Sequence, residues 1–340
     1  MLRFLAIRLA QAIPVLIVMS IITFAIIQAP PGDYGDFIAT NMRTQGNATF
    51  EAAQKAADDY RITHGLKDPM VVQYGRWVWG IVSRGDFGQS YLYNKPVSEV
   101  IAQRLPKTII IALTCHFLAS LLGISFGIIA ATRQYSWIDT VLSFVSFLGM
   151  TVPRFLMALI ILYILAYKLN VQEIGSFFSS KYGGQPWWQG TLDFNFEKLW
   201  NLIQHVWPVI VVATFGGLAY NMRVMRANLL DTLNAQYVET ARAKGLGEGA
   251  VIMRHAVPNA LHPLVAYQGV VLPYMLTGEI EVAIVFGLAT IGPAIVGSMN
   301  IGDVYVTATL LLVLGATLII GNIIADLLLA VLDPRIRVGT

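Results

Sequence analysis

Long apolar runs dominate this 340-residue sequence and limit what it can fold into. A helix that rises about 1.5 Å per residue needs about 20 apolar residues to cross roughly 30 Å of hydrocarbon. Only 13% of the residues are charged, against about 25% in soluble domains, so much of the chain is suited to lipid. The predicted spans are Leu9–Ala29, Thr108–Ala131, Ile138–Tyr167, Val206–Met225, Leu264–Phe286 and Val304–Leu332.

The first apolar run predicts a retained membrane helix. A cleaved signal peptide has an apolar region of roughly 7–15 residues before a cleavage site with small residues. This run is longer, and it ends in Ala29-Pro-Pro-Gly32, which terminates a helix.

The basic residues near the ends of these runs predict the orientation. Lysine and arginine in short loops favour the cytoplasmic side. With six spans, both termini and the 227–262 loop fall on that side. The residues that carry this pattern are Arg3, Arg8, Arg133, Arg223, Arg226, Arg242, Lys244, Arg254, Arg335 and Arg337.

Two longer connections lie on the other side. Residues 30–107 are polar and predict a small extracytoplasmic domain, with a helix over Phe50–His64 and a turn over Gly85–Ser90. Residues 170–205 contain several tryptophans. These suit either the membrane interface or a packed cap over the mouth of a pore.

Motifs for catalysis are absent from the sequence. It contains no phosphate-binding loop, no His-Glu-x-x-His motif and no nucleophile elbow, and the single Cys115 lies in an apolar run. The net charge of +3 does not indicate a nucleic-acid partner. If the protein moves a solute uphill, the energy comes from a partner or from an ion gradient.

The cytoplasmic loop from Tyr237 to Ala260 is the most informative segment. It predicts a short helix with the small residues Ala241 and Ala243, which Gly245 terminates. Small side chains allow another surface to approach closely, as in a docking site for a soluble partner. An ordinary solvated loop explains the same residues, and the residues alone leave both interpretations open.

This segment resembles the EAA loop of ABC-importer permeases, in the form T-A-R-A-K-G-L that is typical of the dipeptide and oligopeptide branch. In that family the loop forms a coupling helix that sits in a cleft of the ATPase subunit. The resemblance therefore implies an ATPase-coupling role for Tyr237, Glu239, Thr240, Ala241, Arg242, Ala243, Lys244, Gly245, Leu246 and Pro258.

A second stretch is similar to the first permease of such transport systems. It includes Gly85-Asp-Phe-Gly-Gln-Ser90, Arg104-Leu-Pro-Lys-Thr108 and Trp137-Ile-Asp139. The resemblance implies an all-α polytopic membrane protein with six helices of the type I ABC importer permease kind. It divides the chain into a first helix (1–29), an extracytoplasmic domain (30–105) and a permease core (106–335) that contains the coupling loop (231–260).

The resemblance also implies the partners. These are a homologous second permease in a heterodimer, two ABC ATPases that bind ATP and Mg, and an extracytoplasmic solute-binding protein. The chain itself is expected to hold no cofactor or metal, to catalyse no reaction and to lie in the bacterial inner membrane. The implied cargo is a peptide-like, opine-like or oligosaccharide solute. The alternative is a gradient-driven secondary transporter that uses Arg154, Glu279, Glu281 and His116 to couple ions.

Three charges fall inside predicted spans. Arg154 follows Pro153 in the third span, and Glu279 and Glu281 lie in the fifth. A charge in mid-bilayer costs about 2.5–3.5 kcal/mol on insertion scales, so such groups face a cavity or pair with an opposite charge. One hypothesis places Arg154 on the translocation pathway, paired with a glutamate or meeting an anionic cargo group. The other is a structural ion pair.

Overall fold

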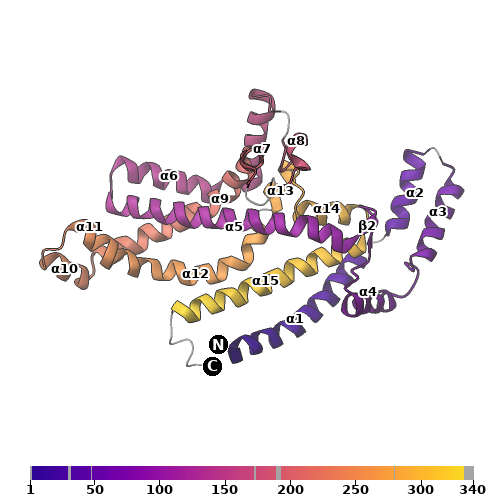
Figure 1. Cartoon of the computed structure of the whole chain (residues 1–340), viewed down its shortest axis with the longest axis horizontal. Coiled ribbons are helices and arrows are strands. Elements are labelled where there is room, and N and C mark those ends of the chain that lie inside the picture. The colour runs from indigo at the N-terminus through magenta and orange to yellow at the C-terminus, as the bar shows by residue number, and fades with distance from the viewer. Residues whose placement is uncertain are drawn as a thin grey trace. The chain divides into compact units, whose positions relative to one another are not determined.

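Figure 1 shows the computed structural model of the chain, which describes residues 2–29, 32–46, 48–171, 174–188, 193–278 and 280–332. The chain forms two compact units. Unit 1 contains the described residues up to Thr108 together with Thr290–Ile323. Unit 2 contains Ile109–Ala289 and the last part of the C-terminal helix. Helices account for most of both units, which confirms the predicted all-α class.

Unit 1 joins the N-terminal elements to the start of the C-terminal helix. Its elements are α1 (Leu2–Gln28), α2 (Tyr34–Thr44), α3 (Phe50–Thr63), α4 (Met70–Arg84), β1 (Gln89–Ser90), β2 (Lys95–Pro96), the first turns of α5 (Val97–Thr132), α14 (Ile291–Asn300) and most of α15 (Val304–Leu332). The predicted helix over 50–64 is confirmed as α3, which Thr49 caps by accepting a hydrogen bond from the Ala52 N–H. The placement of 30–105 outside the cytoplasm stays a prediction.

Unit 2 contains the remaining helices. They are the rest of α5, α6 (Trp137–Thr151), α7 (Arg154–Tyr163), the π-helix η1 (Ile164–Lys168), α8 (Ser180–Gly183), α9 (Phe196–Leu233), α10 (Gln236–Ala243), α11 (Glu248–Val251), the π-helix η2 (Ile252–Ala256), α12 (Val257–Gly278) and α13 (Ile280–Phe286). One buried cluster packs α5, α7, α9 and α13 together through residues such as Cys115, Ala158, Val212 and Ala283.

Four helices in the described part of the chain are long and apolar enough to cross a membrane. They are the spans Ala6–Gln28, Val97–Thr132, Phe196–Leu233 and Val304–Ile324, which match the first, second, fourth and sixth predicted spans. The number rises to six if two bent pairs, α6–α7 and α13–α14, each count as one span. The predicted fifth span, Leu264–Phe286, is divided between α12 and α13, and Glu279 between them lies outside the described residues.

The predicted third span, Ile138–Tyr167, is sharply bent within its length. The segment is two helices, α6 and α7, with 103° between them (Figure 1). Pro153 causes the break, since it has no N–H to donate and it disfavours helical backbone at the residue before it. Val152 accordingly has an extended conformation, with φ −80° and ψ 124°. Arg154 is therefore the first residue of α7.

Asp303 fixes the β1–β2 hairpin of unit 1. Its buried carboxylate accepts hydrogen bonds through Oδ2 from the hydroxyl of Ser90 at 3.0 Å and from the backbone N–H groups of Tyr91 and Leu92 at 2.8 and 2.9 Å. Asp303 directly precedes α15, and its Oδ1 accepts from the Val306 N–H at 3.3 Å. One side chain thus joins the hairpin to the start of this helix.

Candidate docking site

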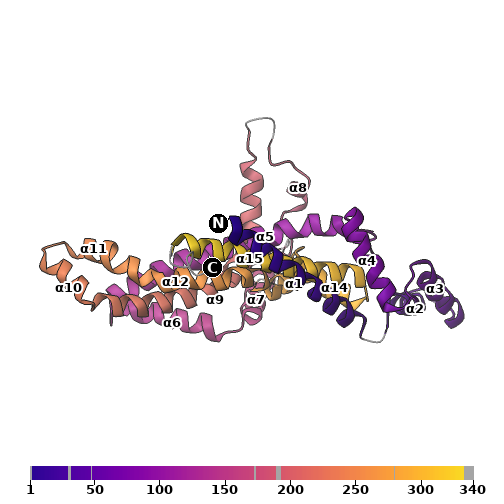
Figure 2. The ribbon, with the colours of Figure 1, turned by 90° about the horizontal axis from the view of Figure 1, so that it is seen from below.

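The α10–α11 loop lies beyond the ends of α9 and α12 (Figures 1 and 2). The helix α9 ends at Leu233, two residues form a turn, and α10 begins at Gln236. It ends before Gly245, which has φ +78°. This left-handed backbone favours glycine because a Cβ would crowd the following carbonyl oxygen. The predicted short helix that Gly245 terminates is therefore confirmed.

One face of α10 is fixed to unit 2. Val238 and Ala241 are buried in a cluster with Met225 and Leu229 of α9 and with residues of α11, η2 and α12. Ala241 is small enough to let α10 lie close to these helices. Val238 was not among the predicted site residues, although its place three residues before Ala241 puts both on one helix face.

The other face of α10 and the turn after it are exposed. Tyr237 and Leu246 keep 46% and 43% of their surface, and Met253 of η2 keeps 58%. The structure thus brings the predicted residues from 237 to 246 together, with only Ala241 turned inward. Pro258, the second residue of α12, is also exposed. The other exposed residues of this loop are Gln236, Glu239, Thr240, Arg242, Ala243, Lys244, Gly245, Gly247, Glu248 and Gly249.

Arg242 holds the turn in shape. Its Nη2 lies 2.8 Å from Oε1 of Glu248, and its Nη1 donates to the Leu233 carbonyl at 3.2 Å. The hydrogen bond between the two side chains raises the pKa of Arg242 and lowers the pKa of Glu248. Glu248 was not among the predicted site residues, because its nearness to Arg242 depends on the reversal of the chain at Gly245.

The predicted pathway residues lie elsewhere in unit 2. The guanidinium of Arg154 lies over α9, where a Cβ on Gly216 would be only 3.1 Å from its Nε. Glu281 is exposed on α13, and α7 and α13 pack together through Ala158 and Ala283. Glu279, the other predicted partner of Arg154, lies outside the described residues. The pathway role of Arg154 stays a prediction.

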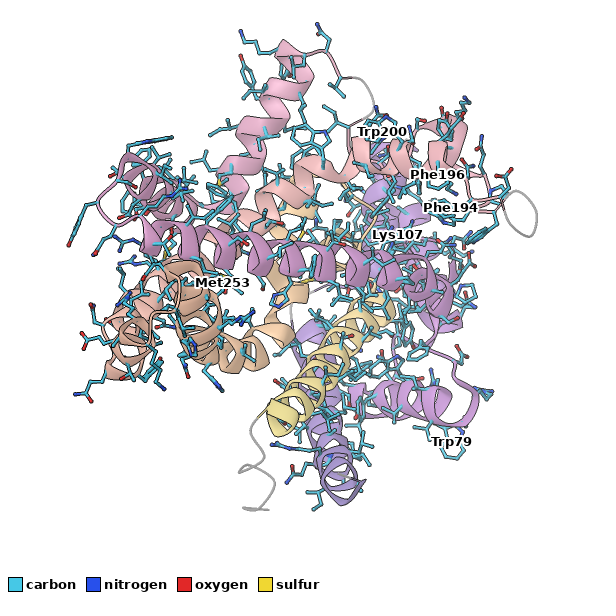
Figure 3. All side chains as sticks on the ribbon, turned by 60° about the vertical axis from the view of Figure 1, so that its left-hand side comes forward. Trp79, Lys107, Phe194, Phe196, Trp200 and Met253 are labelled. Atoms are coloured by element: carbon cyan, nitrogen blue, oxygen red, sulfur yellow. The ribbon has the colours of Figure 1, made fainter. Side chains whose placement is uncertain are left out.

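The loop before α9 is packed and also presents aromatic side chains. The Lys198 ammonium lies 4.9 Å from the ring centroid of Phe178 and 4.8 Å from that of Trp187, an arrangement that cation–π attraction stabilises. Figure 3 shows Phe194, Phe196 and Trp200 at this end of α9, far from Met253. Trp200 is 61% exposed. The packed-cap interpretation fits Trp187, and the interface interpretation fits Trp200.

No group of three or more His, Cys, Asp or Glu residues in the described ranges is arranged to hold a metal ion.

Two family models match almost the whole sequence. Residues 123–338 match the binding-protein-dependent transport system inner membrane component, and residues 1–112 match the N-terminal part of the corresponding membrane component.

Several transport-system permease proteins are similar to this chain over nearly their full length. The oligopeptide transport system permease protein AppB of Bacillus subtilis is 33% identical over 332 residues, which are 97% of this chain and 98% of that protein. The dipeptide transport system permease protein DppB of Alkalihalophilus pseudofirmus is 32% identical over 346 residues, again 97% and 98%. A putative peptide permease protein of Brucella suis is 33% identical over 339 residues, 99% of this chain and all of that protein.

Proposed function

Because this chain belongs to the family of binding-protein-dependent transport system inner membrane components, we propose that it forms half of the pathway of an ATP-driven peptide importer. The relatives named for oligopeptide and dipeptide transport support peptides as the cargo. They favour this reading over the gradient-driven transporter. The opine-like and oligosaccharide cargoes have no such support.

The observation that carries the proposal is the exposed outer face of α10 and its turn. Its inner face is packed in the buried cluster that contains Val238, Ala241, Met225 and Leu229, so a force applied to the exposed face of α10 reaches α9. An ABC ATPase docks on this face in the proposed complex. Two such ATPases bind ATP and Mg, which this chain does not bind, and their closure moves the membrane helices.

The remaining partners complete the pathway. A homologous second permease forms the other half as a heterodimer, and a solute-binding protein delivers the peptide on the extracytoplasmic side. Both termini and the α10–α11 loop face the cytoplasm of the bacterial inner membrane, and residues 30–105 lie outside, in keeping with the distribution of lysine and arginine. Arg154 and Glu281 border the pathway in this proposal, with Glu279 as a further candidate.

Two glycine substitutions test the docking site. Both Gly245 and Gly249 are exposed, and a Cβ on either would meet no atom within 4 Å, but only Gly245 has a positive φ. Gly245→Ala strains the turn by about 1 kcal/mol, which corresponds to roughly five-fold weaker ATPase binding if the turn must keep its shape. Gly249→Ala serves as the matched control.

The measurement is the amount of ATPase that co-purifies with each variant in mild detergent, relative to the amount of this chain. The expected result is clearly less ATPase with Gly245→Ala and no change with Gly249→Ala. Equal ATPase in both variants contradicts docking at this turn.

A further inference from the structure

Movement of α10 is tied to α9. The Leu233 carbonyl at the end of α9 accepts a hydrogen bond from Arg242 of α10 at 3.2 Å. Met225 and Leu229 of α9 are fully buried in the cluster that holds Val238. The last two turns of α9 and α10, which is the docking helix of the proposed function, are therefore packed as one body.

An ion pair joins this part of α9 to α6. Arg226 donates through Nε to Oδ1 of Asp139 at 2.6 Å and through Nη2 to Oδ2 at 2.7 Å. Asp139 is only 4% exposed, and its Oδ2 also accepts from the Tyr135 N–H at 3.0 Å. A two-pronged pair of this kind fixes orientation as well as distance. Arg226 lies between Met225 and Leu229 in sequence. The ion pair therefore binds α9 at the level of the buried cluster that holds Val238 of α10.

The rest of α6 follows α9 toward the α7 corner. The Ser146 hydroxyl donates to the Ala219 carbonyl at 2.8 Å. A Cβ on Gly149 would lie 2.9 Å from the Cβ of Ala219, so the two helices are nearly in backbone contact there. Beyond the corner, Arg154 lies over Gly216. The helix α6 is thus attached to α9 from Arg226 to Ala219, and the start of α7 is attached at Gly216.

The ion pair differs from the other attachments. Ser146 makes a single hydrogen bond and Gly149 makes van der Waals contacts, both of which permit some sliding or rotation of α6. The bidentate pair restrains both. The ion pair also lies at the start of α6, next to the part of α9 that packs against α10. Movement of α10 would reach the other helices of unit 2 at this point.

We propose that Asp139 and Arg226 are positioning residues that transmit movement of the docking helix to α6 and to the α6–α7 corner. The proposal rests on the proposed function, since it requires an ATPase to move α10. Without the pair, the ATPase still binds and hydrolyses ATP, but α6 follows α9 less faithfully. The cycle then uses more ATP for each solute that crosses.

The test uses the whole complex, with its ATPases, second permease and binding protein, in proteoliposomes. Asp139→Asn and Arg226→Gln each remove the ion pair. Arg223→Gln removes a charge from the same helix and serves as the control, since within the described residues the side chain of Arg223 makes no ion pair and lies 3.9 Å from the sulfur of Met150. The probe is a pooled peptide digest of casein, with uptake measured by mass spectrometry and hydrolysis by phosphate release.

The expected result is a fall of at least about five-fold in uptake per ATP for Asp139→Asn and Arg226→Gln, because coupling between sites commonly amounts to 5–150-fold. ATPase content stays normal, and Arg223→Gln leaves the ratio unchanged. A merely structural role would lower thermal stability without changing this ratio. An unchanged ratio, or an equal fall in Arg223→Gln, overturns the proposal.

If the single variants assemble poorly, a reversible covalent cross-link between α6 and α9 tests the proposal instead. In a Cys115→Ser background, Asp139→Cys and Arg226→Cys are joined by a short bis-methanethiosulfonate reagent, which a reductant removes. Uptake per ATP that rises on bridging and falls on reduction supports the proposal, and a bridged complex without any gain overturns it. If the unsubstituted chain purifies without an ATPase, the proposed function fails, and this inference fails with it.

Discussion

Single buried polar groups organise both units. Asp303 gathers donors from Ser90, Tyr91 and Leu92, and Asp139 gathers donors from Arg226 and Tyr135. Burial raises the pKa of Asp303, against the opposing effect of the hydrogen bonds that it accepts. Neither acid was a predicted site residue. Arg226 and the hairpin donors are far away in sequence from these acids, and a pattern of residue types does not reveal which distant groups meet.

Asp303→Ala is expected to loosen the hairpin of unit 1. It leaves one hydroxyl and three backbone N–H groups without their acceptor, at about 1–3 kcal/mol for each donor that water does not reach. Asp86→Ala is the control, because Asp86 accepts only from the Gly88 N–H at 2.9 Å and is exposed. Thermal unfolding in detergent should show a clear loss for Asp303→Ala and a much smaller one for Asp86→Ala. Equal stability of the two variants would contradict the role of Asp303.

At the scale of helices, sequence patterns predicted where a helix forms better than how successive helices are oriented. The helix α3 was predictable because Thr49 caps it and alanines suit its interior. The corner between α6 and α7 was missed because hydropathy is nearly continuous across Pro153, and hydropathy says nothing about direction. The turn after α10 was predictable from Gly245, whereas the partner of Arg242 was not.

The pair of helices α2 and α3 is expected to loosen in acid. Arg61 of α3 binds Asp33 and Asp36 at 2.8 and 2.6 Å and Asp58 at 3.2 Å. The pKa of Asp36 is lowered from its ordinary 3.8, mainly by the Asp33 backbone N–H and further by Arg61. A lowered pKa means that the ionised carboxylate stabilises the folded form. This stabilisation is present above pH 3.8 and is lost as the pH falls through the lowered value.

Spin labels at the exposed Thr40 of α2 and Lys55 of α3 measure the distance between the two helices by electron–electron double resonance. The distance distribution should be narrow at neutral pH and broaden as the pH falls through the lowered pKa of Asp36. Arg61→Met should show the broad distribution already at neutral pH. A distribution in the unsubstituted protein that stays narrow even when all carboxyl groups are protonated would count against the ionic attachment of α2 to α3.

For the whole molecule, the sequence was sufficient for class and family. Long apolar runs predicted a polytopic helical protein, and the motif from Tyr237 to Leu246 predicted the family to which the chain belongs. The sequence does not contain the partners that would complete the pathway. The chain does present an exposed face on α10 whose reverse side is packed into unit 2, and in the proposed function this face docks an ATPase.

The most direct test is the composition of the complex purified from native membranes through a tag on this chain, measured by quantitative mass spectrometry. We expect one homologous second permease and two ABC ATPase subunits for each copy of this chain. Purification of this chain without any ATPase, in a detergent that keeps other ABC importers intact, would contradict it.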